Sequence, residues 1–322
     1  MEKIIEREQV FVEDFVPDRI LFRDKQIQRL KRYFEPNMEG SVYVFLHGPA
    51  GTGKTTVLKH LLAWLNGTSG KILAVYIDCT NCRTTNAVFQ EILSRVSNRI
   101  IPLQISNYRL TKMIGEESRK RRLIVCLDDF GWLKEKEITN RLLRLGCNLV
   151  LAADKPHTLE QVGHLFQDVN FQPYSENEAV EILRGRATLG LSSGSYDNDI
   201  LNMIASACNG NMKIGISVLW RAARKAQDEG KNCIEANDVM TALDSCLVGE
   251  DKELKRRLSP SEQLIHSIIE EGGQIKGTDV QRLLERTLLI SDKTTRNHLK
   301  NLVSCGLVKA SGGKRSRAYR TM

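Results

Sequence analysis

The strongest chemical signal in the sequence is the run GPAGTGKT at residues 48–55. It matches the pattern GxxxxGK[ST] and lies between an apolar, β-rich run, SVYVFLHG, and the stretch KTTVLKHLLAWL, which has helical spacing. Glycines at this spacing let backbone N–H groups close around phosphate oxygens, assisted by the positive end of the following helix. The pattern predicts a phosphate-binding loop lined by Gly48, Pro49, Ala50, Gly51, Thr52, Gly53, Lys54, Thr55 and Thr56.

Two carboxylates could complete this site. The run LIVCLDDF places Asp128 and Asp129 at the end of an apolar strand. We expect Lys54 to reach the outer phosphates, and Thr55 and Asp128 to hold Mg²⁺, so ATP or ADP with Mg²⁺ is the predicted cofactor. Asp129 stands where a water-activating base would stand, but AAA+ ATPases usually have the longer glutamate there. The alternative is a buried strand that ends in a solvated pair of aspartates.

Strands and helices alternate around these motifs. The strand-like runs ILAVYIDC, LIVCLDD and NLVLAAD follow the first strand, with helices predicted near residues 86–96 and 108–117 and a short helix after the third strand. This alternation predicts an α/β P-loop domain with a parallel sheet covered by helices on both faces, and together with the two motifs it resembles a domain of the AAA+ type. After PYSENEAVEILRGRA only helical patterns continue, to about Cys246, which predicts a small all-α lid domain.

A third domain is predicted at the C-terminal end. The charged stretch GEDKELKRR is typical of a linker, and Ser259 to Glu262 form a capping-box pattern with proline at the first helical position. Three helical patterns near residues 260–271, 277–285 and 292–304 precede two short β-like stretches around SGGKRSR, which is the order of a winged helix. We therefore divide the chain into an AAA+ domain (1–171), a lid (172–250) and a winged-helix DNA-binding domain (251–322).

The positive charge of the chain is concentrated in this last domain. The net charge is +8, and from Ser291 onward eight basic residues face a single acidic one. Basic and polar residues share one side of the third helix, opposite its leucines, so that side could enter the major groove of double-stranded DNA. The candidate DNA-binding residues are Lys293, Thr294, Arg296, Asn297 and Lys300 on the helix, and Lys314, Arg315 and Arg317 in the basic turn. The alternative is a solvated helix face.

Composition excludes several classes of protein. The chain has 322 residues, 41% hydrophobic and 27% charged, which is typical of globular domains and not of disordered chains. No apolar run approaches the ~20 residues of a membrane span, and no signal peptide is recognised, so we expect an intracellular protein without a membrane partner. The eight cysteines are expected to be free thiols, including the pair Cys79 and Cys82, for which we expect a structural role and not a zinc site.

With these motifs in place, the chain resembles the archaeal origin recognition complex/cell division cycle initiator family of replication proteins. The resemblance is carried by VPDRILFRDKQI before the loop, VYIDCTNCRTTNAVFQEI after the second strand, FQPYSENEAVEIL at the start of the lid, GNMKIGISVLWRAARKA late in the lid, and LSPSEQ. It implies a nucleotide-bound switch that recognises origin DNA, helps recruit or load the MCM helicase, works with other initiator copies, and is cytoplasmic and nucleoid-associated.

The same resemblance assigns further site residues. The implied adenine site consists of Val16, Pro17, Ile20 and Arg23, with Tyr174 and Ile182 closing it from the lid. Ordinary packing at a domain junction is the alternative for these six. Lys213 stands where the family has its sensor-2 arginine; lysine keeps the charge but lacks the planar fork.

Other departures from the family concern hydrolysis. Ala153 or Asp154 replaces the usual asparagine of the sensor-1 strand, and no arginine occurs between Lys155 and Tyr174 to act as a finger. Together with Asp129, these departures predict slow hydrolysis, that is, a weak ATPase acting as a switch. Two other functions stay open: a nucleotide-sensitive DNA-binding regulator that loads no helicase, and a purely catalytic ATPase motor, against which the missing finger argues.

Overall fold

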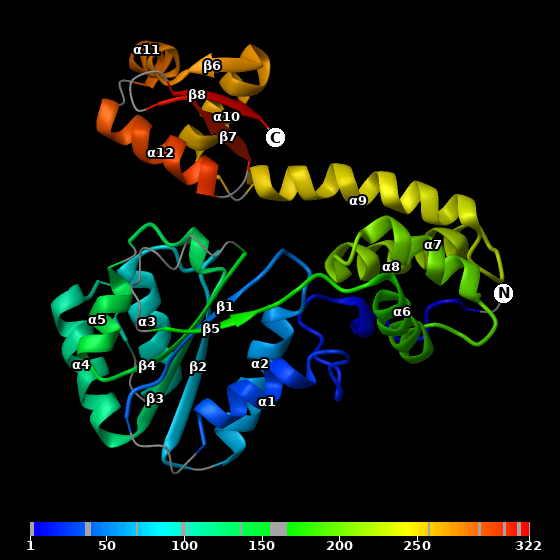
Figure 1. The fold of residues 1–322 in the computed structure, drawn as a ribbon, viewed down its shortest axis with the longest axis horizontal. Helices are drawn as coiled ribbons and strands as arrows, with labels where there is room; N and C mark the ends of the chain where they lie inside the picture. Colours follow the sequence, from blue (N-terminus) through cyan, green and yellow to red (C-terminus); the bar gives the residue numbers. More distant parts are fainter. Residues whose placement is uncertain are drawn as a thin grey trace. The chain divides into compact units, whose positions relative to one another are not determined.

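The computed structural model divides into two compact units, Met1–Cys246 and Leu247–Met322 (Figure 1). It describes residues 3–35, 40–68, 70–97, 101–102, 104–135, 137–154, 166–256, 258–288, 291–304, 307–313 and 317–321. In that part of the chain, no helix is long and apolar enough to cross a membrane.

A five-stranded sheet forms the centre of the first unit. Its strands are β1 (Tyr43–His47), β2 (Ile72–Asp78), β3 (Arg122–Asp128), β4 (Asn148–Ala153) and β5 (Gln167–Asn170), in the order β2-β3-β4-β1-β5. All neighbouring pairs are parallel, which confirms the predicted α/β architecture. The edge strand β5 was not predicted, because only Val169 of its four residues is buried and the run has no apolar pattern.

Helices cover both faces of this sheet, as expected for a parallel sheet. On one face lie α1 (Asp24–Tyr33) and α2 (Lys54–Thr68); on the other lie α3 (Thr85–Val96), α4 (Asn107–Lys120) and α5 (Ile138–Arg144), with the 3-10 helix η2 (Phe130–Trp132) after β3 (Figure 1). Each face has its own buried cluster. Strand β3 serves both, since Val125 and Leu127 belong to one cluster and Ile124 and Cys126 to the other.

The lid of the first unit contains α6 (Glu176–Gly190), α7 (Asn198–Cys208), α8 (Met212–Asp228) and the start of α9 (Ala236–Arg256). The N-termini of α6, α7 and α8 are capped by side chains that accept hydrogen bonds from the first turn, namely those of Ser175, Asp197 and Asn211. Apolar residues of all four helices form one cluster. The AAA+ fold with a helical lid is thus the architecture that the motifs predicted.

The segment of residues 4–15, here called the N-terminal segment, packs into the lid. Ile4, Ile5, Val10 and Phe11 are buried members of the lid cluster, the last two in the 3-10 helix η1 (Glu8–Phe11). Arg186 of α6 donates a 2.7 Å hydrogen bond to the Val10 carbonyl, and its guanidinium lies 4.4 Å from the centre of the Phe15 ring. The N-terminal segment is therefore part of the lid and not of the sheet core.

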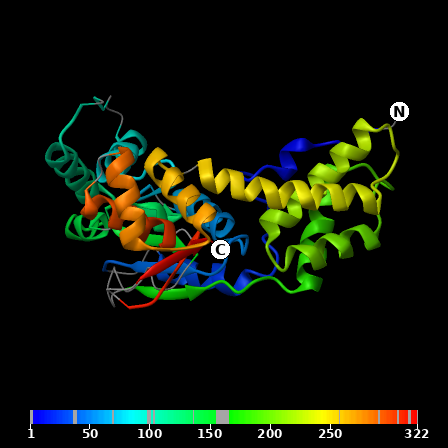
Figure 2. The ribbon, with the colours of Figure 1, turned by 90° about the horizontal axis from the view of Figure 1, so that it is seen from above.

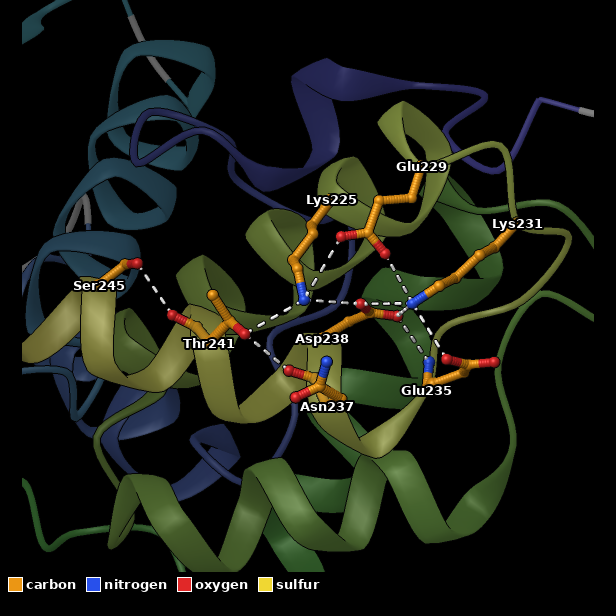
Figure 3. A network of polar contacts seen from close by, with 8 residues as sticks. All are labelled: Lys225, Glu229, Lys231, Glu235, Asn237, Asp238, Thr241 and Ser245. Atoms are coloured by element: carbon orange, nitrogen blue, oxygen red, sulfur yellow. Dashed lines mark hydrogen bonds and ion pairs between the residues drawn. The ribbon is translucent and has the colours of Figure 1, made fainter.

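A buried carboxylate fixes the start of α9 (Figure 3). The side chain of Asp238 is fully buried and lies 3.1 Å from Lys225 Nζ and 2.9 Å from Lys231 Nζ. It also accepts a hydrogen bond from the Glu235 N–H at 3.0 Å, which caps the helix. Helix α8, which carries Lys225, is thereby tied to α9.

Helix α9 continues without interruption through most of the stretch predicted as a linker (Figures 1 and 2). It ends at Arg256, ten residues beyond the boundary between the two units at Cys246. The stretch predicted as a linker lies just after the boundary between the two units, as expected, and it is helical over residues 249–256. The reason is composition, because Glu, Lys, Leu and Arg are among the stronger helix formers.

The second unit combines three helices with a small antiparallel sheet, within the part that the structure describes. The helices are α10 (Pro260–Gly272), α11 (Gly277–Leu288) and α12 (Asp292–Ser304), and the strands are β6 (Gln274–Lys276), β7 (Val308–Ser311) and β8 (Ala318–Thr321), in the order β6-β8-β7. The predicted capping box is present: the Ser259 hydroxyl accepts from the Glu262 N–H, and the Glu262 carboxylate accepts from the Ser259 N–H. Glu262 is buried and also accepts a 2.7 Å hydrogen bond from Asn301, which ties α10 to α12.

Candidate functional site

The predicted phosphate loop follows β1 and turns directly into α2, whose first residue is Lys54. Gly48, Gly51 and Gly53 have φ angles of +148°, +72° and +88°, which side-chain-bearing residues rarely adopt. All three also lie against neighbouring segments: a Cβ on Gly48 would be 2.0 Å from the Phe171 carbonyl oxygen, one on Gly51 would be 1.8 Å from Asn211 Oδ1, and one on Gly53 would be 2.7 Å from the Tyr174 hydroxyl. The loop therefore needs glycine for both its conformation and its close packing.

The loop has the hydrogen-bond donors that a phosphate group requires. Among the residues that the structure describes, no hydrogen bond outside the helices joins the backbone N–H of Gly53, Lys54 or Thr55 to a backbone carbonyl. These donors lie just before and in the first turn of α2, where N–H groups have no partner within the helix and the helix dipole is positive. The local geometry thus fits the phosphates of a nucleotide.

Lys54 is buried beneath the loop. Its Nζ donates to the carbonyl oxygens of Gly48 at 2.6 Å and Pro49 at 2.9 Å, and to Asp154 Oδ1 at 2.8 Å. Asp154 directly follows β4, the strand next to β1. Of the two residues considered for the sensor-1 position, Ala153 is buried in β4 and Asp154 is the one whose side chain reaches the loop.

Asp128 and Asp129 follow one another at the end of β3, beside the loop. Asp128 is buried and accepts a 3.0 Å hydrogen bond from the Tyr76 hydroxyl of the adjacent β2. Burial raises the pKa of Asp128, and hydrogen bonds from Thr55 and Tyr76 oppose that shift. Thr55 and Asp128, the two predicted Mg²⁺ ligands, are therefore side by side. Mg²⁺ needs few protein ligands when phosphates supply the others.

Asp129 has an unusual backbone and an unusual charge environment. Its φ and ψ are 51° and 40°, the left-handed region that non-glycine residues seldom occupy. Burial, followed by the charges of Asp128, Asp154 and Asp78, raises the pKa of Asp129 to about 7. A carboxyl group with such a pKa can exchange a proton near neutral pH, as a base that acts on water must.

Arg23 connects the segment before the core with the loop and with the start of the lid. Its guanidinium donates to the carbonyl oxygens of Thr52 at 2.9 Å and Gln172 at 2.7 Å, and it stacks 3.7 Å from the centre of the Tyr174 ring. Among the other residues of the implied adenine site, Val16 and Pro17 are half-buried. Ile20 belongs to the buried cluster of the sheet face that carries α1 and α2, and Ile182 packs against the lid cluster.

The N-terminus of α8 brings the lid to the loop. The Met212 N–H donates a 3.1 Å hydrogen bond to the Gly51 carbonyl, and Asn211 Oδ1 accepts from the Lys213 and Ile214 N–H groups. Lys213 Nζ lies 2.6 Å from Glu13 Oε1 of the N-terminal segment. Sequence reasoning missed the roles of Asn211 and Glu13. The N-cap asparagine before a helical run was a local signal for the first, and nothing in the sequence signalled the second.

The five candidate DNA-binding residues of α12, Lys293, Thr294, Arg296, Asn297 and Lys300, are all exposed, whereas Thr295, Leu299 and Leu302 are buried. One face of α12 is therefore basic and free of the unit's own core, although Arg296 forms an ion pair with Asp292. Arg317 is exposed at the start of the last strand region, and its carbonyl accepts from the Gly277 N–H at 3.0 Å. Lys314 and Arg315 lie outside the described residues.

A structural role was expected for the cysteine pair Cys79 and Cys82. Cys79 is buried, Cys82 is half-buried, and both are free thiols. No group of three or more His, Cys, Asp or Glu side chains that could hold a metal ion occurs in the described ranges. Cys79 and Cys82 lie directly after β2, and Cys79 belongs to a buried cluster, which fits a packing role.

Comparison with known families matches both parts of the first unit. Residues 19–151 match the AAA ATPase domain model, and residues 180–244 match the Cdc6 AAA+ ATPase-type lid domain model. Over most of its length the chain is similar to ORC1-type DNA replication protein 3 of Haloarcula marismortui, with 27% identity over 89% of this chain and 84% of that protein. It is also 26% identical to ORC1-type DNA replication protein 6 of Halobacterium salinarum, over 99% of this chain and 93% of that protein.

Solved structures share the fold. The Orc1 protein of Aeropyrum pernix in complex with DNA superposes with a TM-score of 0.77 and 21% identity, over 99% of this chain and 94% of that chain. The Orc2 protein of the same organism, solved as ADPNP-ADP complexes, gives a TM-score of 0.69 with 20% identity over the same shares of the two chains.

Proposed function

Since the chain belongs to the Orc1/Cdc6-type AAA+ ATPase family of DNA replication proteins, we propose that it is a nucleotide-controlled initiator that recognises duplex DNA at replication origins. The observation that carries the proposal is the glycine-rich loop at residues 48–55, which leads directly into α2, with the half-buried Thr55 and the buried Asp128 beside it. The family implies nucleotide binding, and the identities of the nucleotide and of the metal ion as ATP or ADP and Mg²⁺ are part of the proposal.

The residues have distinct roles in this proposal. The loop N–H groups and Lys54 bind the phosphates, and Thr55 and Asp128 hold Mg²⁺. When bound, Mg²⁺ neutralises charge on the phosphates. Arg23, with Val16, Pro17, Ile20, Tyr174 and Ile182, forms the wall against which the base packs, and Lys213 contacts the phosphates from the lid.

Hydrolysis in this proposal is slow. The side chain of Asp129 is one methylene shorter than that of the usual glutamate. Lys213 lacks the planar guanidinium group with which an arginine binds two oxygens at once. The protein then acts as a switch whose state depends on the retained nucleotide, more than as a motor. A weak ATPase of this kind changes state when nucleotide exchanges, with the lid moving as a body.

The second unit is the DNA-binding part of the proposal. We assign it as a winged helix in which α12 enters the major groove, and the basic residues Lys314, Arg315 and Arg317 of the sequence contact the DNA backbone. Arg296 and Asn297 can read base edges, and Lys293 and Lys300 can neutralise phosphates. The similar fold of the Aeropyrum pernix Orc1 protein in complex with DNA supports this assignment.

Recruitment or loading of the MCM helicase and assembly with other initiator copies are proposed from the family alone, as is a place at the nucleoid in the cytoplasm. A second candidate function is a nucleotide-sensitive DNA-binding regulator that loads no helicase. Two residues favour this second function: the aspartate at position 129 and the charged Asp154 at the sensor-1 position. Both differ from the residues with which the family usually hydrolyses ATP.

Nucleotide binding can be tested by equilibrium titration with ADP and Mg²⁺. Lys54→Ala removes the phosphate-binding cation, and we expect about a hundredfold loss of affinity, as for a charged hydrogen bond. Lys59→Ala is the matched control, because Lys59 lies on the same helix but pairs with Asp14 at 2.5 Å. Equal affinities for the wild type and Lys54→Ala would remove the proposed phosphate site.

The choice between initiator and regulator needs a map of where the protein binds in its own cells. Enrichment where replication begins supports the initiator. Enrichment at promoters away from those sites supports the regulator, and helicase loading is then discarded for this protein.

A further inference from the structure

The three hydrogen-bond donors of the Lys54 ammonium group are all in use. Two go to the carbonyl oxygens of Gly48 and Pro49 in the loop itself, and the third goes to Asp154. An ammonium group has three N–H donors and no acceptor. A phosphate that binds Lys54 must therefore displace an existing partner, and Asp154 is the only charged one among these three.

Asp154 occupies a central place along the edge of the sheet. Because the strand order is β3-β4-β1, the residue that follows β4 lies between the loop after β1 and the two aspartates after β3. The Asp154 side chain is 50% exposed, whereas that of Lys54 is 7% exposed. The lysine is thus fixed in the protein, and the aspartate is the partner that can be released to solvent.

When Lys54 turns to a phosphate, the Asp154 carboxylate loses this ion pair and lies beside the phosphates. Like charges at such distances repel, and the repulsion grows with the charge of the nucleotide. A triphosphate carries one more phosphate group than a diphosphate, and Lys54 is expected to reach the outer phosphates of either. The electrostatic cost of an anion at position 154 is therefore larger for the triphosphate.

We propose that Asp154 is a nucleotide-selecting residue: its carboxylate competes with the terminal phosphate for Lys54 and so favours a nucleoside diphosphate over a triphosphate. This inference rests on the proposed nucleotide site and adds a preference to it. It also makes triphosphate binding depend more strongly on a divalent cation, because Mg²⁺ offsets the added negative charge. Asp154 acts here through the charge balance around Lys54 and takes no part in a bond-breaking step.

The test compares affinities for ADP and for adenylyl imidodiphosphate, a non-hydrolysable triphosphate, by equilibrium titration at constant ionic strength with Mg²⁺. Asp154→Asn keeps the size of the side chain and removes its charge. We expect the affinity for the triphosphate to rise about tenfold, as for loss of one nearby unit charge, and that for ADP to rise about threefold or less. Removal of Mg²⁺ should weaken triphosphate binding more in the wild type than in Asp154→Asn.

Two further variants serve as controls. Asp14→Asn makes the same chemical change at an exposed aspartate that pairs with Lys59, also on α2, and it should leave the ratio of the two affinities unchanged. Asp154→Glu keeps the charge, and its ratio should stay near that of the wild type. Thermal melting without nucleotide checks that each variant is folded; Asp154→Ser replaces Asp154→Asn if the latter does not fold.

The outcomes separate this inference from the proposed function. If the wild type binds both nucleotides and the ratio is the same in Asp154→Asn, Asp154 does not select the nucleotide, and the nucleotide site itself stands. If the wild type binds neither nucleotide, the proposed function fails first. A changed ratio in Asp154→Asn together with an unchanged one in Asp14→Asn and Asp154→Glu supports the inference.

Discussion

The guanidinium carbon of Arg23 lies 3.7 Å from the centre of the Tyr174 ring, although 150 residues separate the two in the chain. The same guanidinium donates hydrogen bonds to the carbonyls of Thr52 and Gln172. Arg23 thus connects the phosphate loop to the point where the chain enters the lid. Burial lowers the pKa of Arg23, but an arginine remains charged at neutral pH.

We expect Arg23→Lys to lower the free energy of unfolding by about 2 kcal/mol, because lysine cannot serve two carbonyls and stack on a ring with one planar group. Denaturant unfolding measures this change. Arg29→Lys is the control, since Arg29 also contacts a tyrosine ring, that of Tyr33, but is exposed. Equal effects of the two substitutions would show that the contacts of Arg23 add nothing.

The raised pKa of Asp129 predicts that the free energy of unfolding depends on pH in Mg²⁺-free buffer. Its pKa of about 7 lies above the ordinary value of 3.8, so the folded protein holds a proton that the unfolded chain releases. The resulting stability is fully present below about pH 4 and is lost as the pH rises to 7. One pKa unit corresponds to about 1.4 kcal/mol, and partial exposure reduces the effect. We therefore expect the free energy of unfolding of Asp129→Asn, relative to that of the wild type, to rise by about 2 kcal/mol from pH 5 to pH 8.

Asp14→Asn is a control for that experiment, because the pKa of Asp14 is shifted in the opposite direction. Its hydrogen bond and ion pair with Lys59 lower the pKa of Asp14, so the substitution should matter only above about pH 4, with no further change between pH 5 and pH 8. Parallel pH profiles for Asp129→Asn and the wild type would contradict the raised pKa of Asp129. Asparagine is the suitable replacement because it tolerates a left-handed backbone.

The network around Asp238 predicts a local loss of stability (Figure 3). Asp238→Asn keeps the shape of this buried side chain but removes the charge that Lys225 and Lys231 share. We expect a loss of about 2 kcal/mol, measured by thermal or denaturant unfolding. Glu229→Gln, which changes a half-exposed member of the same network, should have no resolvable effect on stability. A larger loss for Glu229→Gln than for Asp238→Asn would mean that Glu229, and not Asp238, carries the stabilising charge.

The exposed face of α12 predicts two different DNA-binding phenotypes. Lys300→Ala should weaken binding to all sequences alike and reduce the slope of log K against log salt by about 1. Asn297→Ala should instead narrow the difference between specific and unrelated DNA, by about 1–3 kcal/mol for a lost base contact. Arg282→Ala on α11 is a control for general charge effects. Fluorescence anisotropy over a salt series distinguishes these outcomes.

Phe11 tests the packing of the N-terminal segment. Its side chain is buried against α6, where a Cβ on Gly190 would lie 2.4 Å from the Phe11 ring. Phe11→Ala should cost about 3 kcal/mol, as for other buried aromatic residues. The neighbouring Val12 is 51% exposed, so Val12→Ala should be close to neutral. Similar melting temperatures for both variants would mean that the segment does not stabilise the lid.

The sequence predicts those features that depend on short segments. Lys54, Thr55 and Asp128 were identifiable because a loop or a strand end is encoded in a few consecutive residues. The helix α10 was identifiable for the same reason, through the capping box of Ser259 and Glu262. Helical periodicity likewise predicted α12 over the residues that the structure gives it.

Contacts between distant segments were not predictable in this way. The pairing of Lys54 with Asp154 follows from the order of β4 and β1 in the sheet, which periodicity does not encode. The insertion of Ile4 and Phe11 into the lid depends on partners in α6, and the short segment carries no signal that names them. Strand β5 was missed because pairing with β1, and not its own composition, makes it a strand.

The position of residues 4–15 within the lid also has a consequence for biosynthesis. These residues are synthesised before their neighbours in α6, which begins at Glu176, so all five strands of the AAA+ sheet are made before the segment can contact its partners. Contacts of such high sequence separation form late and slow folding. Ile4, Ile5, Val10 and Phe11 are buried in the folded protein, and we expect them to be exposed apolar residues of the nascent chain until α6 has been synthesised.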